Sequence, residues 1–133
     1  MRGQASAEVI VVVVIVALAL IALLPTYTGL ATASDEHIAE REARIAVDQI
    51  ADAARSVWLQ GSSARVTVPI AVPETTQRLS YSGQRIILTY STSQGERDAY
   101  HVLPFNITGN TTTPVRTINV KLEATSSGVI ARS

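Results

Sequence analysis

Few residues of this chain could carry out chemistry, and their spacing favours none of the common catalytic or metal sites. The sequence has 2 histidines, His37 and His101, and no cysteine. One histidine falls in a helical pattern and the other in a strand pattern, and no further ligating cluster accompanies either. Metal and nucleophilic sites need several such groups together, and no glycine-rich phosphate loop is present. We therefore predict a protein that is not an enzyme and holds no metal or cofactor.

The most informative side chain is a single carboxylate, Glu8, which stands directly before an apolar run from Val9 to Leu24. A charge at membrane depth is costly unless an opposite charge lies close to it. Only residues 1–7 come before this carboxylate. We therefore expect its partner to be an amino terminus, its own or a neighbour's, or the guanidinium of Arg2.

The apolar run itself is typical of a helix that is covered by lipid or by other helices. It contains no polar break and is apolar on every face, which excludes a half-solvated helix. Sixteen to eighteen residues of helix reach about 24–27 Å at 1.5 Å per residue, close to the roughly 30 Å hydrocarbon core of a bilayer. Pro25 follows at once, and because proline removes a backbone donor we predict a kink or local melting there.

A second, amphipathic helical segment follows over residues 34–60. Its apolar positions recur at three- and four-residue spacing: Ile38, Ile45, Ala46, Ile50, Ala53 and Val57. We predict that one stripe of this helix packs on the chain's own head and that the remainder packs on neighbouring copies of the chain. Gly61 is expected to end the helix. Trp58, near that end, is predicted to pack against the module that follows.

Residues 64–133 have the pattern of a small β-rich head. Six short strands are predicted from their alternation and from turn signals at Ser82-Gly83 and Gln94-Gly95, over 65–70, 77–81, 84–90, 98–103, 115–124 and 129–130. Residues 106–114 are predicted to be a polar loop. The fold class expected is α+β, with a long helix, kinked near Pro25, and a small antiparallel sandwich or barrel.

Composition narrows the classes of partner. Lys and Arg number 11, Asp and Glu number 11, and aromatic residues make up 5% of the chain. A net charge of zero argues against a surface for polyanionic nucleic acid, and the scarcity of aromatic rings argues against base stacking. We therefore expect no nucleic-acid partner.

The amino-terminal motif resembles that of a known family. Gly3-Gln4-Ala5-Ser6-Ala7-Glu8 directly before an apolar run is similar to the class III signal peptide of archaeal type IV pilins, in which a glutamine, a serine and a glutamate stand two positions apart. The resemblance implies a leader, residues 1–3, that a membrane prepilin peptidase removes between Gly3 and Gln4. It also implies a pilin architecture, with the helix of residues 4–60 carrying the head.

The resemblance further implies a structural function as the major pilin of an extracellular filament, held in the cytoplasmic membrane before assembly. The partners implied are copies of the same chain, an assembly ATPase and a polytopic platform protein, and the expected use is adhesion. We predict that the assembly residues are Glu8, Val9, Val12, Val13, Val16, Leu20, Leu24 and Pro25.

Three alternatives stay open at this stage. The chain could be an archaeal flagellar filament subunit, or a minor pilin or membrane-anchored binding module. It could also be a secreted soluble β-module, released by cleavage after Ala33, because the apolar run followed by Ala31-Thr32-Ala33 is also typical of a removable signal,. Finally, Asn106-Ile107-Thr108 and Asn110-Thr111-Thr112 are two N-glycosylation sequons in the predicted polar loop,, and we predict that this loop carries glycan.

Overall fold

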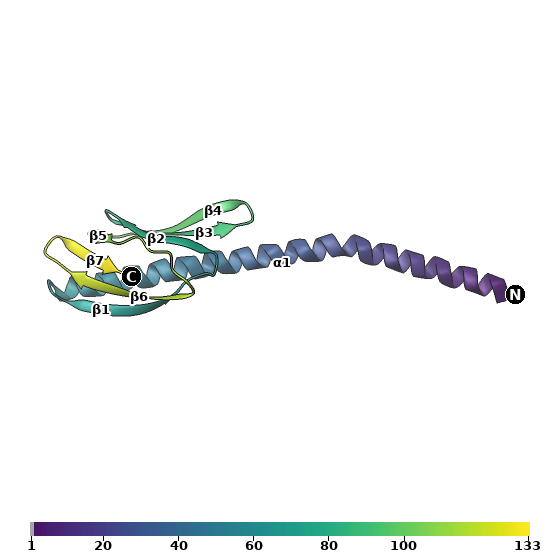
Figure 1. Cartoon of the computed structure of the whole chain (residues 1–133), viewed down its shortest axis with the longest axis horizontal. Coiled ribbons are helices and arrows are strands. Elements are labelled where there is room, and N and C mark those ends of the chain that lie inside the picture. Colours follow the sequence, from purple (N-terminus) through teal and green to yellow (C-terminus); the bar gives the residue numbers. More distant parts are fainter. Residues whose placement is uncertain (1) are drawn as a thin grey trace. The chain divides into compact units, whose positions relative to one another are not determined.

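The computed structural model describes the backbone of residues 2–133 and the side chains of residues 6–30 and 33–133. One long helix, α1 (Arg2–Gln60), precedes seven strands, as Figure 1 shows. The fold is therefore α+β, as predicted. The chain divides into two compact units, Met1–Asp35 and Glu36–Ser133. The second unit contains the last part of α1 and all of the strands.

Helix α1 continues through Pro25 without a break, so of the two outcomes predicted at this position, a kink or local melting, local melting is excluded. Proline removes only one intrahelical hydrogen bond, and a nearby threonine hydroxyl can bond to main-chain carbonyls of the preceding turn. Here Thr28 Oγ1 donates to the carbonyl oxygens of Leu24 at 3.3 Å and of Pro25 at 3.1 Å. These contacts support the backbone on the carboxyl side of the proline.

The end of α1 follows the sequence signal. The helix stops at Gln60, and Gly61 adopts a φ of 95° while its N–H donates to the carbonyl of Trp58 at 3.2 Å. A glycine in the left-handed region is a common helix terminator because it has no Cβ to clash. The ring of Trp58 stacks on that of Phe105 with centroids 5.1 Å apart, which confirms that this tryptophan packs on the head.

The strands form two sheets in the second unit. Strands β1 (Arg65–Ala71), β6 (Thr117–Ala124), β7 (Gly128–Arg132) and β5 (Asn106–Gly109) make a four-stranded sheet in that order. Strands β2 (Thr76–Ser82), β3 (Arg85–Thr92) and β4 (Gly95–Val102) make a three-stranded sheet. All neighbouring strands are antiparallel except β5 and β7, which are parallel.

Strand β5 corrects the prediction of six strands and of a loop over residues 106–114. Its central residue, Ile107, is fully buried and pairs with Val129 of β7. One apolar residue within a polar tract gives no alternation, so the sequence pattern could not reveal this strand. The four-stranded sheet is mixed because β5 runs parallel to β7, whereas its other strand pairs are antiparallel.

The two hairpins of the three-stranded sheet lie near their predicted positions. Ser82 pairs with Arg85, so the first turn is Gly83-Gln84, one residue later than predicted, and Gly83 has a φ of 60°. Thr92 pairs with Gly95 and encloses Ser93-Gln94. These registers decide which side chains of β3 and β4 face the core and which face outward.

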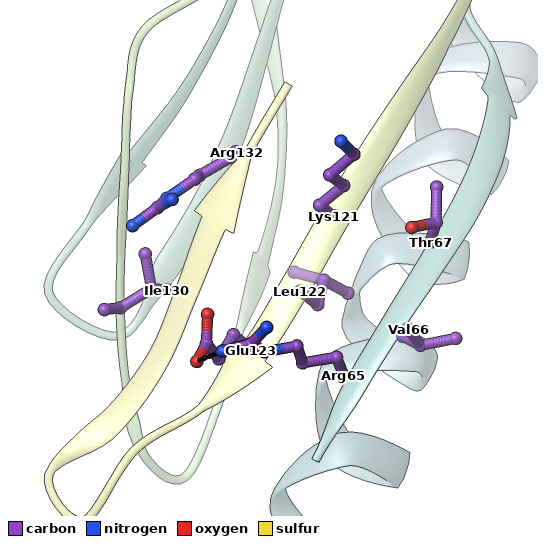
Figure 2. Close-up of a pocket in the computed structure, with 8 residues that line it drawn as sticks. All are labelled: Arg65, Val66, Thr67, Lys121, Leu122, Glu123, Ile130 and Arg132. Atoms are coloured by element: carbon purple, nitrogen blue, oxygen red, sulfur yellow. Dashed lines mark hydrogen bonds and ion pairs between the residues drawn. The ribbon is translucent and has the colours of Figure 1, made fainter. Parts of the chain in front are cut away.

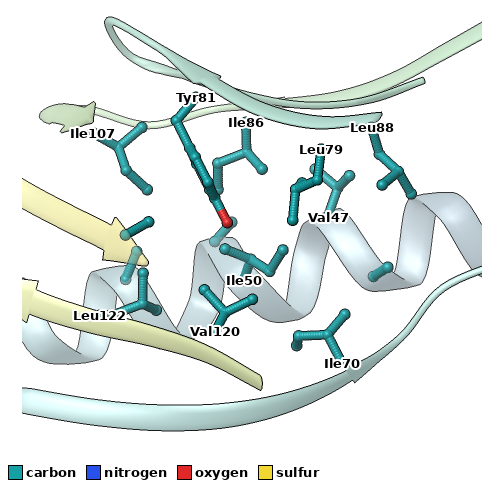
Figure 3. Packing of buried hydrophobic residues seen from close by; sticks show 14 of the residues in the cluster. Val47, Ile50, Ile70, Leu79, Tyr81, Ile86, Leu88, Ile107, Val120 and Leu122 are labelled. Atoms are coloured by element: carbon teal, nitrogen blue, oxygen red, sulfur yellow. The ribbon is translucent and has the colours of Figure 1, made fainter. Parts of the chain in front are cut away.

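The helix lies inside the core of the head. Its residues Val47 and Ile50 are each 1% exposed, and side chains from both sheets converge on them, as Figure 3 shows. Tyr81 and Ile86 reach this stripe from the three-stranded sheet, and Val120 does so from the other. The expected sandwich is therefore built around a helix, and the core of the head is completed by α1.

The buried stripe on α1 includes only part of the apolar pattern of the sequence. It recurs at three- and four-residue spacing, as a helix face requires, and its members are Ala43, Ala46, Val47, Ile50, Ala51, Ala54 and Val57. Ile38 and Ile45 follow the same helical period but are 52% and 55% exposed, so they lie outside the stripe that packs on the head. Four of the seven residues of this stripe are alanines: Ala43, Ala46, Ala51 and Ala54.

Candidate assembly surface

The largest exposed apolar surface of the described chain lies on the first unit. Every large apolar side chain of residues 9–24 is between 51% and 62% exposed. By length and composition this is a helix that could cross a membrane, with a mean hydropathy of 3.2 over its most apolar 18-residue window and none of that window buried. A soluble monomer rarely exposes a contiguous apolar surface of this extent. Something other than this chain must therefore cover it.

The predicted assembly residues fall on several faces of this helix. Val9, Val12, Val13, Val16, Leu20 and Leu24 are 62%, 59%, 60%, 52%, 60% and 61% exposed, respectively. Because no face of the helix is polar between residues 9 and 24, one flat partner would leave most of it uncovered. The surface requires partners on all sides, either lipid or several other helices.

Glu8 lies at the amino-terminal edge of this surface and is exposed. It lies beside Ala7, Val11 and Val12, which line a shallow depression together with it. The ion pairs of the described residues all lie in the second unit, so none of them neutralises this carboxylate. The predicted partners, the amino terminus and Arg2, lie outside the residues whose side chains are described, and so do Gly3 and Gln4 of the predicted cleavage site.

The second unit adds an exposed apolar strip on α1. Ile38 and Ile45 lie seven residues apart, about two turns, and therefore on the same side of α1. Leu59, a further fourteen residues on, is 84% exposed. Only the complete buried stripe distinguishes these residues from core residues, since all of them match the same helical period.

A polar network ties the helix to the edge strand β4. The imidazole of His101 lies 2.8 Å from Asp48 Oδ1 through Nδ1 and 3.1 Å from Arg55 Nη2 through Nε2. Arginine has only donors, so Nε2 must accept and Nδ1 must carry the hydrogen that is donated to Asp48. This arrangement holds the imidazole between two helix side chains. It contains no nucleophile, and its role is to fasten β4 to α1.

The two sequons occupy different environments in the second unit. Asn106 opens β5 and is exposed. Asn110 is exposed too, but its side-chain amide donates to Thr112 Oγ1 and to the carbonyl oxygen of Ser133, both at 3.2 Å. A glycan on Asn110 would replace one of the two amide hydrogens and so remove one of these bonds. Asn106 is therefore the more accessible of the two predicted sites.

Comparison with known proteins adds no relative from which a function could be taken. No family model matches the chain, and neither a curated protein nor a solved structure does. The candidate function therefore depends on the motif and on the exposed surface.

Proposed function

We propose that this chain is the major structural subunit of an extracellular, type IV pilus-like filament, which assembles by packing of its apolar amino-terminal helices. The observation that carries the proposal is the surface of residues 9–24, which is apolar on all sides and at least half exposed along its whole length. Copies of the same helix can surround such a surface completely. The glutamine-serine-glutamate motif before it supports the same conclusion.

The physical drive for assembly changes between membrane and filament. Within the bilayer, lipid covers apolar side chains as well as another helix does, so packing and polar contacts must favour association. Outside the membrane, a departing subunit would expose roughly 1,000 Å² of apolar surface, at about 25 cal/mol per Å². Its release into water would then cost on the order of 25 kcal/mol, and the filament would persist without disulfides.

Glu8 sets the register in this proposal. A carboxylate inside a packed helical core is stable only when a cation lies close, and removal of one partner from a buried pair costs about 3–5 kcal/mol. The amino terminus of a neighbouring subunit, after cleavage between Gly3 and Gln4, is the cation that fits. Subunits out of register would leave both charges unmatched.

The remaining parts of the proposal follow from this role. The subunit waits in the cytoplasmic membrane, a prepilin peptidase removes residues 1–3, and an ATPase with a platform protein extrudes the filament. The second units form its outer surface and serve adhesion. Ile38 and Ile45, which are half exposed in the single chain, are covered by neighbouring subunits.

A second candidate function, that of a secreted or membrane-anchored head, is favoured by one observation. The core of the unit Glu36–Ser133 contains no residue before Ala43, so cleavage after Ala33 would leave that core whole. A secreted head, or a head held at the membrane by its helix and present in few copies, would use the same chain. A flagellar filament subunit would share the topology and is the third possibility.

Electron microscopy of material sheared from the cell surface, with mass spectrometry of its main protein, tests the proposal. We expect thin filaments whose dominant protein begins at Gln4 and retains residues 9–24. A dominant species beginning at Ser34 would refute the filament role and support secretion. A chain found only in membranes, at low copy number, would support the anchored module.

A further inference from the structure

The outer face of the four-stranded sheet carries two cations directly across from each other. Lys121 of β6 is the register partner of Arg132 of β7, and both side chains are exposed. Directly opposed residues of antiparallel strands have Cβ atoms about 4.5–5.5 Å apart, and like charges there destabilise the pair. Figure 2 shows the two side chains on neighbouring strands with their charged heads pointing apart, as expected for like charges on flexible stems.

The nearest carboxylate on this face is already engaged. Glu123 lies two residues from Lys121 along β6 and accepts a hydrogen bond from Arg65 Nη2 at 2.8 Å, the dashed contact in Figure 2. Among the described residues, no carboxylate lies within ion-pair distance of Lys121 or Arg132. The local balance is therefore three cations against one anion, with the excess charge on the opposed pair.

The surroundings of the pair suit a ligand that is polar and extended. The pair borders an open depression of about 170 Å³, which Thr67 and Ile130 also line. Thr67 of β1 is the register partner of Lys121, so a hydroxyl group flanks this cation. No aromatic ring lines this depression, and a stacking platform for nucleic-acid bases is absent from it.

We propose that this face is a docking surface for an acidic polysaccharide, with Lys121 and Arg132 binding its carboxylate or sulfate groups. The charge excess selects an anion, and a depression that holds the hydroxyl of Thr67 but no aromatic ring favours a sugar polymer over stacked nucleic-acid bases,. The choice of a polymer rests on the proposed function, since a filament repeats a weak two-cation site in every subunit and thereby binds a repeating ligand with high avidity. This assigns the chemistry of adhesion to one face of the head.

A property of the sequence makes the test unusually direct, because Lys121 is the only lysine of the chain. An amine-acetylating reagent therefore modifies only this side chain and the amino terminus. The full chain in detergent micelles is acetylated alone and with polygalacturonate, dextran sulfate, uncharged dextran or duplex DNA, and the modified peptides are quantified. We expect polygalacturonate or dextran sulfate to slow acetylation of Lys121 severalfold while the amino terminus reacts at its usual rate.

The other outcomes of this experiment count against the proposal. Equal protection by uncharged dextran would show that charge does not select the ligand. Protection by DNA at or above that by the polysaccharides would replace the sugar polymer with nucleic acid. No protection by any polymer would overturn the proposal. The measurement uses single chains in micelles, so it stays valid even if the chain forms no filaments. That failure would defeat the proposed function alone.

Substitutions distinguish binding by Lys121 and Arg132 from a general effect of positive charge on the head. Lys121→Gln with Arg132→Gln should lower retention on immobilised polygalacturonate by about tenfold or more when filaments are used, because avidity multiplies each loss of site affinity. Arg78→Gln with Arg85→Gln removes the same charge from β2 and β3 and should leave retention unchanged. Equal loss in both double variants would overturn the site.

Lys121→Glu gives a second check against simple misfolding. It places opposite charges across β6 and β7, so the thermal midpoint should stay level or rise while binding is lost. Retained binding by this variant would contradict the proposal. If Lys121 in filaments is already protected without added polymer, a neighbouring copy covers the face, and this result too would overturn it.

Discussion

The two halves of α1 place isoleucine in opposite environments. Ile15 in the first unit is 60% exposed, whereas Ile50 in the second is 1% exposed and contacts both sheets. In the second half the chain supplies its own cover, because the strands pack on an alanine-rich stripe. In the first half the described chain supplies none. The comparison teaches that the chain's own strands bury one half of the helix, whereas the described residues leave the other half exposed.

The sequence patterns of the two halves explain this difference. Residues 9–24 are apolar on every face, while residues 36–60 carry charged side chains such as Glu42 and Asp52 on the exposed side. A stripe can be covered by one folded domain, but a helix that is apolar all round must be surrounded. The difference between the halves can be tested by matched substitutions.

The largest expected effect concerns the charge at the edge of the uncovered half. Glu8→Val should insert into the membrane normally but give few filaments, because the amino terminus of a neighbour would then lie unmatched in the core. Filament yield is measured from sheared material and membrane content by immunoblot. Glu96→Val, which removes an exposed carboxylate from β4, is the control. Filament yield at the normal level from the Glu8 variant would remove its role in assembly.

Truncation of one isoleucine in each half of α1 should affect the stability of the head differently. Ile50→Ala should destabilise the head by about 2–5 kcal/mol, since it removes buried methyl and methylene groups and leaves a cavity. Ile15→Ala makes the same chemical change on the same helix and should leave the unfolding of the head unchanged. Denaturant unfolding of the full chain in detergent, followed by the Trp58 fluorescence, measures both. Equal losses would show that the first half is packed in the isolated chain.

A smaller effect on stability is expected at a buried hydroxyl group in the core of the head. Tyr81 OH has no hydrogen-bond partner among the described residues, and burial raises the pKa of this phenol above its ordinary value. Tyr81→Phe should stabilise the head by about 1 kcal/mol, because it removes an unsatisfied polar group. Tyr100→Phe, at a side chain that is 66% exposed, should change the stability little.

The same tyrosine predicts the direction of a pH effect. Above the ordinary tyrosine pKa of about 10, the unfolded chain loses the phenolic proton while the folded chain keeps it. Stability should therefore be fully present below that pH and fall as the pH rises above it. Unfolding midpoints measured at increasing alkaline pH should decline less steeply for Tyr81→Phe than for the parent chain. Parallel declines would show that Tyr81 is ionised as easily in the fold.

The smallest change in stability is expected from glycan on the solvated surface of the second unit. We predict that Asn106 carries glycan more often than Asn110, whose amide is engaged by Thr112 and Ser133. Mass spectrometry of the peptide spanning residues 98–115 from native filaments gives the occupancy of each site. Bare peptide would refute glycosylation, and higher occupancy at Asn110 would refute the argument from its hydrogen bonds.

Much of the fold was predictable because its signals are local. The apolar run, the helix end at Gly61 and the two hairpins depend on residues close together in sequence, and all appear within one or two residues of the expected places. Strand β5 was not predictable, because its pairing with β7 joins segments about twenty residues apart. The contact of Trp58 with Phe105 was predicted only in part, as packing against an unspecified surface.

The surfaces were less predictable than the elements. Ile38 and Ile45 follow the same period as the buried residues, and only the position of the strands determines which stripe is covered. The opposed cations Lys121 and Arg132 lie eleven residues apart, and only the register of β6 and β7 places them together. Helical period predicts faces, whereas the choice among faces is made by tertiary packing.

The position of α1 inside the head has a mechanical consequence. A pull applied to the chain from its amino-terminal side enters the second unit through the helix on which both sheets pack at Val47 and Ile50. The load is then shared as shear across many side-chain contacts at once, and no edge strand can be peeled away one hydrogen bond at a time. A domain whose core contains the helix that carries the load should resist tension far better than a domain that is pulled through a terminal strand.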